Sequence, residues 1–325
     1  MNFQKVLTIV HGNCHDGISA GYCAYLKYNN IADLDMLFVS PSNQYPMYTY
    51  LEEYLQKHPD AKVLFFDLGL KGEILDKVDA LGCDYLAFDH HSGSYRDIST
   101  YFESAGKPIP EKYTFDNNRS GVHLAWDHLF PNLELPKPLA YLEDGDLWRF
   151  ALPDAMTIIT GLHSMLPKNT STELEDASEL YSQWDALMDD PNLLSKALEV
   201  GGYLLADQEA RMDTLKGKAR IYEINGLRAY VVNTSSFDIV SKMGNKLVKM
   251  TDDEGKYLCD YSLLWHHDAR NKQFGVSLRS RGAHDQGVDV SAIAQGFSPN
   301  GGGHYSASGF KTQNLEETLG IKLGS

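Results

Sequence analysis

The chain has 325 residues, of which 43% are hydrophobic and 22% are charged, so it can bury a sizeable core and is neither disordered throughout nor fibrous. Its length favours two domains, although one large domain is allowed. Lysine and arginine number 29 against 44 acidic residues, and the formal charge of −15 argues against a non-specific binder of duplex DNA or of anionic membranes.

The first half of the chain alternates short apolar runs with amphipathic segments. Strands are predicted at residues 6–10, 62–66 and 84–88, and helices at residues 18–28, 73–81, 119–130 and 137–143. This alternation indicates βαβ units, in which helices cover both faces of a parallel sheet. The predicted fold class is therefore α/β, with an N-terminal doubly wound, mainly parallel sheet.

The second half of the chain is predicted to form a helical linker and a smaller α/β domain. Asn225-Gly226 lies between two short apolar runs, which is a strong signal for a β-hairpin. Further strands are predicted at residues 257–265 and 274–279, and a helix at 288–297. The predicted division is residues 1–165 for the first domain, 166–217 for the linker and 218–325 for the second domain.

The cysteine and apolar patterns indicate a cytoplasmic protein. The four cysteines (Cys14, Cys23, Cys83 and Cys259) form no CxxC pair, which fits a reduced compartment. The first apolar run, at residues 6–10, is shorter than the apolar core of a signal peptide. No stretch approaches the roughly 20 apolar residues of a transmembrane helix. We therefore expect a soluble protein without a membrane partner.

Residues that can bind metals follow three consecutive predicted strands. The first strand is followed by His11, His15 and Asp16, the second by Asp67, and the third by Asp89, His90 and His91. In open α/β sheets, ligands bind outside the carboxyl ends of the strands, so these residues should converge. A single Asp or His at a strand end is more often a cap or turn residue, but three such strand ends in succession are hard to explain by coincidence.

A further acidic pair, Asp144 and Asp146, follows a predicted helix and is a candidate to complete the cluster. Carboxylates mixed with imidazoles suit Mn²⁺, Fe²⁺ or Zn²⁺. The excess of carboxylates favours Mn²⁺ or Mg²⁺. The sequence therefore predicts a divalent metal site.

Two motifs carry a family resemblance. FDHHSGS, residues 88–94, resembles the signature of the DHH phosphoesterase superfamily, and GGGHYSASG, residues 301–309, resembles that of its C-terminal companion, the DHH-associated domain. IVHGNCHDGISA, FFDLG and EDGDLW occur in the family's order, so the resemblance covers nearly the whole chain. It implies a hydrolase of phosphate esters or anhydrides that uses two metal ions, usually Mn²⁺, and a hydroxide bound between them.

The resemblance also implies roles for the matching residues. Those that match the family's metal ligands are His11, Asp16, Asp67 and His90, with Asp67 bridging both ions. His91 would contact the scissile phosphate, and Asp89 would orient the histidine pair. These assignments give the first domain its expected catalytic machinery.

Two points of the metal set stay open. Either Asp144 or Asp146 matches the fourth motif. The common first motif has Asp at the fourth and sixth positions after its histidine, where this chain has His15 and Gly17. Either His15 replaces a ligand, or one metal site is weaker and differently shaped.

The second domain carries candidates for binding the substrate phosphate, in a cleft between the domains. They are Arg279, Arg281, Gly301, Gly302, Gly303 and His304. Glycine backbones let N–H groups approach an anion closely, and arginines make charge-assisted contacts to phosphate. For Arg119, a substrate contact and a solvated helix start capped by Ser120 are equally good interpretations.

The expected function is hydrolysis of small nucleotide phosphodiesters, such as short single-stranded oligonucleotides or cyclic dinucleotides. Alternatives are an exopolyphosphatase, a phosphatase of nucleoside bisphosphates, and a non-catalytic nucleotide sensor that has lost one metal. The negative charge weighs against a processive exonuclease on long strands. The oligomeric state stays open, with a homodimer among the possibilities.

Overall fold

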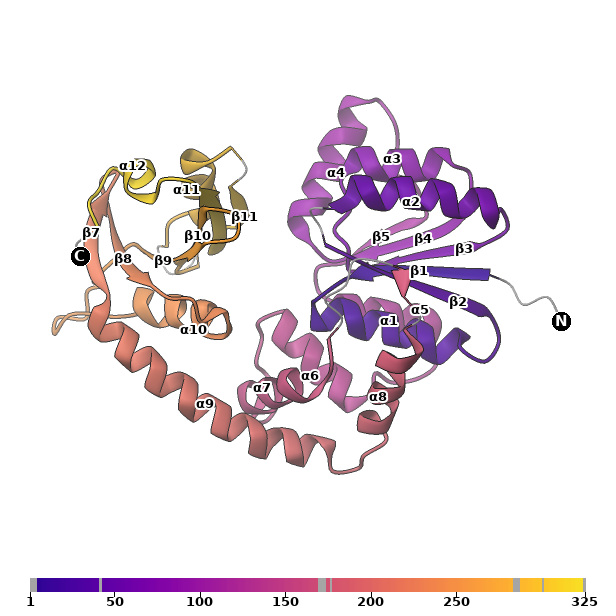
Figure 1. The fold of residues 1–325 in the computed structure, drawn as a ribbon, viewed down its shortest axis with the longest axis horizontal. Coiled ribbons are helices and arrows are strands. Elements are labelled where there is room, and N and C mark those ends of the chain that lie inside the picture. The colour runs from indigo at the N-terminus through magenta and orange to yellow at the C-terminus, as the bar shows by residue number, and fades with distance from the viewer. Residues whose placement is uncertain are drawn as a thin grey trace. The chain divides into compact units, whose positions relative to one another are not determined.

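The computed structural model describes residues 5–40, 43–168, 174–175, 177–282, 287–299 and 301–323. The chain divides into two compact units, the first reaching residue 205 and the second starting at residue 206. Helix α9 (Leu193–Lys218) runs across this boundary (Figure 1). Among the described residues, no helix combines the length and the apolarity that a membrane crossing requires.

The first unit is built on a six-stranded sheet with the order β5-β4-β3-β1-β2-β6. Its strands are β1 (Lys5–His11), β2 (Asp33–Val39), β3 (Lys62–Phe66), β4 (Asp84–Asp89), β5 (Tyr113–Phe115) and β6 (Leu174–Glu175). All neighbours pair in parallel except β6, which is antiparallel to β2. The predicted α/β fold class is confirmed. The strand order reverses between β1 and β3, which is where ligands bind in such sheets.

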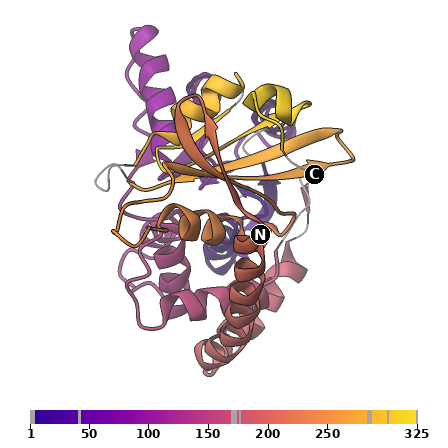
Figure 2. The same cartoon turned by 90° about the vertical axis from the view of Figure 1, so that its left-hand side faces the viewer.

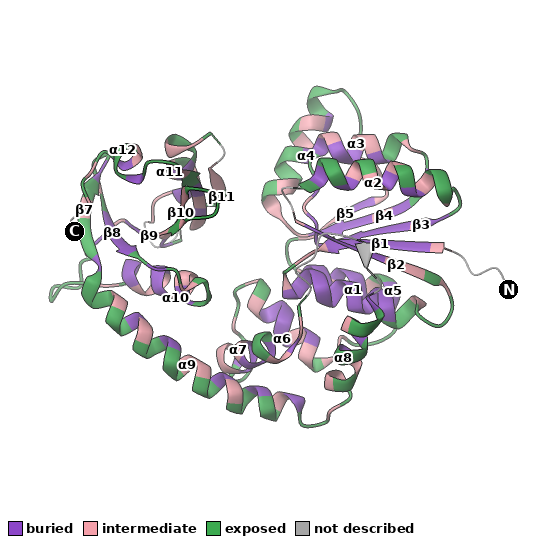
Figure 3. Ribbon diagram, in the orientation of Figure 1, coloured by how far each residue is buried: buried purple, intermediate pink, exposed green. Residues whose placement is uncertain are grey.

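Helices cover both faces of this sheet (Figure 3). They are α1 (His15–Tyr28), α2 (Gln44–Lys57), α3 (Gly72–Ala80), α4 (Ser92–Ser104), α5 (Gly121–Leu129), α6 (Lys137–Asp146), α7 (Ala155–Met165) and α8 (Ser178–Met188). Because side chains alternate along a strand, Val6 and Val10 of β1 pack in one core while Leu7 and Ile9 pack in the other. Burial on both faces explains why the buried centre of β1 is apolar except for Thr8.

The second unit has its own six-stranded sheet, with the order β11-β12-β10-β9-β8-β7. Its strands are β7 (Arg220–Ile224), β8 (Leu227–Asn233), β9 (Tyr261–Asp268), β10 (Gln273–Ser280), β11 (Gly302–His304) and β12 (Ala307–Thr312). Only β8 and β9 pair in parallel. Figure 2 shows α10 (Phe237–Val248) on one face of the sheet, and α11 (Val290–Phe297) and α12 (Leu315–Leu319) on the other.

Several elements escaped prediction. In the first unit these are β2, β5, β6, α2, α4 and α7, and in the second unit α10, α12, β11 and β12. Strand β2 begins with the partly exposed residues Asp33 to Asp35, so its apolar run is too short to stand out. The predicted linker of residues 166–217 includes α8, whose Tyr181 and Trp184 are fully buried in the core of the first unit. That packing makes α8 part of the first unit rather than a free connection.

Candidate active site

The carboxyl ends of three adjacent strands bring the predicted metal residues together. His11 ends β1, Asp67 directly follows β3, and Asp89 ends β4. Asp67 has a φ of 58°, in the left-handed region, where few residues other than glycine lie. An unusual backbone at a buried carboxylate is typical of a functional site.

One group of potential metal ligands consists of His11, Asp67 and His91, whose ligand atoms lie within 4.8 Å of one another. The Nδ1 atom of His11 lies 3.5 Å from Oδ2 of Asp67. Among the described residues, neither of these two buried atoms has a hydrogen-bond partner. Two orphaned polar atoms that face each other fit a cation between them.

A second group consists of Asp16, Asp67 and His90. The Nε2 atom of His90 lies 3.0 Å from Oδ1 of Asp67, 3.6 Å from Oδ2 of Asp16 and 3.5 Å from Oδ2 of Asp146. Asp67 therefore belongs to both groups: its Oδ2 faces His11, and its Oδ1 faces His90 and lies 3.8 Å from Nδ1 of His91. This arrangement fits the bridging role that the family resemblance implies for Asp67.

The electrostatics of the cluster also fit cations. Burial, together with the nearby carboxylates of Asp146 and Asp67, raises the pKa of Asp16 well above its usual value. Burial and Asp67 raise the pKa of Asp146 to about 6. Burial disfavours the charged form of His90, but its hydrogen bond to Asp67 raises its pKa to about 9. Protons thus hold together carboxylates that would otherwise repel one another, a role that divalent ions can take over.

The N-terminus of α5 holds Asp16 in place. Backbone N–H groups of Gly121 and Val122 donate to its two carboxylate oxygens at 2.6 and 3.0 Å. A side chain at position 121 would not fit, because its Cβ would lie 2.5 Å from Cβ of Asp67 and 2.8 Å from Oδ2 of Asp16. The pattern Ser120-Gly121 before an apolar helix was the available sequence signal, but it did not reveal this contact.

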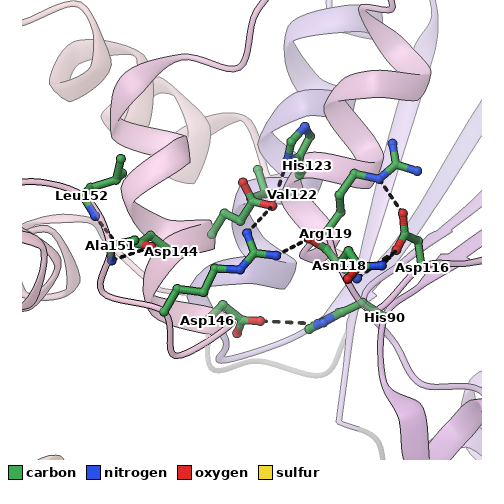
Figure 4. A network of polar contacts seen from close by, with 12 residues as sticks. His90, Asp116, Asn118, Arg119, Val122, His123, Asp144, Asp146, Ala151 and Leu152 are labelled. Atoms are coloured by element: carbon green, nitrogen blue, oxygen red, sulfur yellow. Dashed lines mark hydrogen bonds and ion pairs between the residues drawn. The ribbon is translucent and has the colours of Figure 1, made fainter.

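The structure separates Asp144 from Asp146. The carboxylate of Asp144 accepts hydrogen bonds from the backbone N–H groups of Ala151 at 3.0 Å and Leu152 at 3.2 Å, while Asp146 faces His90 (Figure 4). Asp144 therefore shapes the loop that follows α6. Of the two, Asp146 is positioned to join the cluster.

His15 belongs to neither group of potential metal ligands, so the structure does not support the alternative in which it replaces a ligand of the first motif. Its ring stacks on His163 of α7, with the ring centroids 4.1 Å apart and the planes 6° apart. Burial, followed by the nearby His163 and Lys168, lowers the pKa of His15 to about 2. A neutral imidazole in the core is the role that this geometry supports.

Asp89 and His91 form a close pair. Oδ1 of Asp89 lies 2.7 Å from Nδ1 of His91, and its other carboxylate oxygen accepts a hydrogen bond from the Tyr113 hydroxyl at 3.4 Å. Burial opposes protonation of His91, but Asp89 and Asp67 together raise its pKa to about 10. Asp89 thus orients His91, whereas His90 is oriented by Asp67.

Arg119 lies beside the cluster but is occupied by acidic partners. Its guanidinium pairs with Asp116 at 2.8 Å (Figure 4) and also with Asp127. Next to it, Glu143 accepts a hydrogen bond from His123 at 2.8 Å and lies 4.0 Å from Arg149. The predicted cap is not formed, because the Ser120 hydroxyl is buried and has no hydrogen-bond partner among the described residues. The ion pairs engage the Arg119 guanidinium at the start of α5, and its substrate contact stays a prediction.

In the second unit, Arg279 and His304 lie in one row of the sheet. Arg279 of β10 and His304 of β11 lie on either side of β12, and each is paired in register with Ala307 of that strand. Directly opposed residues in antiparallel strands share a face, so both side chains lie on the face of α10. There Arg279 donates to Ser241 of α10 at 2.7 Å.

Arg281 has a structural role instead of the predicted substrate contact. It is 6% exposed and donates to the backbone carbonyls of Val248 and Cys259 at 2.8 and 2.7 Å. Its guanidinium lies 4.0 Å from the ring centroid of Tyr257. These contacts leave Arg281 inside the unit.

The three positions before His304 differ in why they hold glycine. A Cβ at Gly301 would lie 2.2 Å from the Ala294 carbonyl, and Gly303 has a φ of 144° that other residues rarely adopt. Gly302 has only the end of the Gln295 side chain within 4 Å. Packing therefore requires glycine at position 301, and backbone conformation requires it at position 303. At Gly302, the absence of a side chain leaves the backbone open to a ligand.

The chain is similar to several known proteins. No family model matches the chain. An uncharacterized protein of Acanthamoeba polyphaga mimivirus is 23% identical over 323 residues, which cover 97% of this chain and 69% of that protein. A pGpG-specific phosphodiesterase from Vibrio cholerae aligns with a TM-score of 0.45 and 10% identity, over 97% of this chain and 94% of that chain.

RecJ from Thermus thermophilus, solved in complex with Mn²⁺, aligns with a TM-score of 0.54 and 15% identity, over 97% of this chain and 50% of that chain. The chain therefore shares the fold of RecJ. At the level of the fold, this likeness agrees with the resemblance found in the motifs. In this fold, the Asp-His-His segment lies where β4 ends, next to Asp67.

Proposed function

We propose that the protein is a metal-dependent phosphoesterase that hydrolyses small nucleotide phosphodiesters in the cytoplasm. The observation that carries the proposal is Asp67, a carboxylate that is 1% exposed and shared by two groups of potential metal ligands. Structural carboxylates are rarely buried between histidines and further carboxylates without a functional reason.

The residues of the first unit would hold two divalent ions. His11 at the end of β1, Asp67 directly after β3 and Asp16 in α1 would supply ligand atoms, and His90 and Asp146 would complete the set. Imidazole mixed with carboxylate favours Mn²⁺, the ion present in the RecJ structure of similar fold. When bound, such ions activate water and neutralise the charge that develops on phosphate.

His91 is suited to act on the substrate phosphate. Its Nδ1 is engaged by Asp89, which fixes the ring and leaves Nε2 for another partner. A protonated His91, favoured by the raised pKa, donates to a phosphate oxygen and stabilises its negative charge. The role of Asp89 is to keep the ring in this orientation.

The second unit would contribute a phosphate-binding residue, Arg279. Arg279 is largely buried, and in the part of the chain that the structure describes no carboxylate pairs with it. Arginine without an acidic partner is suited to bind phosphate, and His304 shares its row and face of the sheet. This recognition of one phosphate favours dinucleotides and other compact substrates.

The test is a turnover screen with added metals. The substrates are bis(p-nitrophenyl) phosphate, linear and cyclic dinucleotides, a nucleoside 3′,5′-bisphosphate and polyphosphate, each with Mn²⁺, Mg²⁺, Ca²⁺ or excess chelator. We expect dinucleotide hydrolysis with Mn²⁺, and little with Ca²⁺, which prefers oxygen ligands alone.

The Asp67→Asn variant serves as the control for a contaminating hydrolase. Full activity in chelator would refute the metal mechanism. Cleavage of polyphosphate or the bisphosphate in preference to dinucleotides would identify one of the alternative enzymes. Nucleotide binding without any turnover would identify a sensor.

A further inference from the structure

Trp148 is an apolar side chain left exposed beside the candidate active site. It is 51% exposed, whereas Trp126 is 6% exposed and Trp184 is fully buried. Large aromatic side chains normally bury most of their surface, because that burial is strongly favourable. A tryptophan is expected to lie in the core, and the structure shows Trp148 half exposed instead.

The backbone holds Trp148 in an unfavourable conformation. Its φ is 55°, a left-handed value that is uncommon for a bulky residue, and Phe150 has a φ of 47°. The strain is maintained by Asp144, whose carboxylate receives the N–H groups of Ala151 and Leu152 and whose carbonyl receives that of Arg149. Strain that the surroundings enforce at an exposed residue is typical of a functional position.

Chain geometry places Trp148 within reach of the metal ligands. It is two residues after Asp146, whose carboxylate lies 3.5 Å from His90. Two residues span at most about 7 Å between Cα atoms. The ring is partly supported by Phe150, whose centroid lies 4.8 Å away in an edge-to-face arrangement. The loop that directly follows Asp146 of the cluster therefore carries an exposed aromatic ring.

We propose that Trp148 stacks on a nucleobase of the substrate whose phosphate binds at the Asp67 cluster. This deepens the proposed function and rests on it. Every base has an aromatic face, so stacking binds nucleotides with little base preference. A preorganised ring loses little conformational freedom on binding. The strained loop would hold the Trp148 ring in place and so favour this stacking. The ligand class is a nucleoside phosphate rather than a phosphate without a base.

Tryptophan fluorescence tests the contact without turnover. AMP and ribose 5-phosphate, which differ by the base, are titrated into the wild-type protein with Mg²⁺ and with excitation at the red edge of the indole band. AMP should quench the emission and ribose 5-phosphate should not, and the quenching should disappear in Trp148→Phe. Equal binding of the two ligands, measured by calorimetry, would overturn the proposal.

Kinetics separate stacking from a structural role. Trp148→Ala should lower kcat/KM for a dinucleotide by about tenfold, mostly through KM, and leave an abasic analogue of the dinucleotide unaffected. Trp148→Phe should retain most of the wild-type preference for the dinucleotide. The matched control is Tyr203→Ala, since Tyr203 is 73% exposed on α9.

An equal loss on both substrates in Trp148→Ala would mean that the ring packs against protein, and the proposal would be wrong. That outcome differs from failure of the proposed function, in which the wild-type protein hydrolyses no phosphodiester at all.

Discussion

The backbone N–H of Gly121 donates a 2.6 Å hydrogen bond to the carboxylate of Asp16, which lies 105 positions earlier in the chain. Through this contact, the N-terminus of α5 fixes one oxygen of the candidate metal cluster. The partial positive charge of a helix N-terminus also favours the ionised form of such a carboxylate. The cluster thus depends on a helix that supplies no ligand of its own.

Gly121→Ala should weaken metal binding by about tenfold or more, as is usual when a residue that orients a metal ligand is changed. The new Cβ would meet Asp67 and Asp16 at distances that force them apart. The measurement is Mn²⁺ affinity by calorimetry. Gly202→Ala is the control, because a Cβ there meets nothing within 4 Å. An unchanged Mn²⁺ affinity in Gly121→Ala would show that α5 does not orient the metal ligands.

Asp67→Ala should abolish turnover and metal binding, because Asp67 faces both groups of ligands. His91→Ala should lose rate and retain metal, since its proposed contact is with phosphate. Metal content of the two purified variants decides between the roles. Equal metal loss in both would make His91 a ligand, which its place in the first group also allows.

Arg279 and Arg281 should respond differently to substitution by alanine. Arg281→Ala should lower the free energy of unfolding by about 3 kcal/mol, because two backbone carbonyls lose a charged donor. Arg279→Ala should lose less stability than Arg281→Ala, because Arg279 donates to one carbonyl and one hydroxyl, and should raise KM for a dinucleotide by about tenfold, with little effect on a small aryl phosphodiester. Urea denaturation and steady-state kinetics test the pair. A stability loss without a KM change at Arg279 would contradict the assignment.

Acid should destabilise the protein partly through His15. Its pKa of about 2 in the folded protein lies below the ordinary value of 6.5, so the unfolded chain binds the proton more readily. The associated stability is complete above pH 6.5 and is lost as the pH falls towards 2. His15→Phe retains stacking on His163 and should make unfolding less dependent on pH in this window. An unchanged pH dependence, measured by urea denaturation, would show that His15 is not buried as a neutral ring.

Turnover should decrease as the substrate lengthens. The formal charge of −15 repels phosphates that lie outside the site, and a site for one phosphate gains nothing from further nucleotides. Comparison of kcat/KM for a dinucleotide, a short oligonucleotide and a long single strand measures the effect. A value that rises with length would indicate an exonuclease that tracks along the strand.

Much of the first unit could be predicted because local patterns encode it. The runs at β1, β3 and β4 are apolar on both faces and end in polar residues, so both the strands and the shared edge of His11, Asp67 and His90 follow from the sequence. Less regular segments, such as the tyrosine-rich α2, have no period clear enough to distinguish helix from strand.

The sequence by itself determined which residue types stand at the strand ends, and hence the kind of chemistry. Only the tertiary structure decided which of them point inward. Asp146 faces His90 while Asp144 binds the following loop, His15 stacks on His163, and Arg281 is buried. Side-chain direction and burial depend on partners far along the chain, such as Gly121 for Asp16. Such contacts leave no local pattern in the sequence, because they arise only when the helices pack on the sheet.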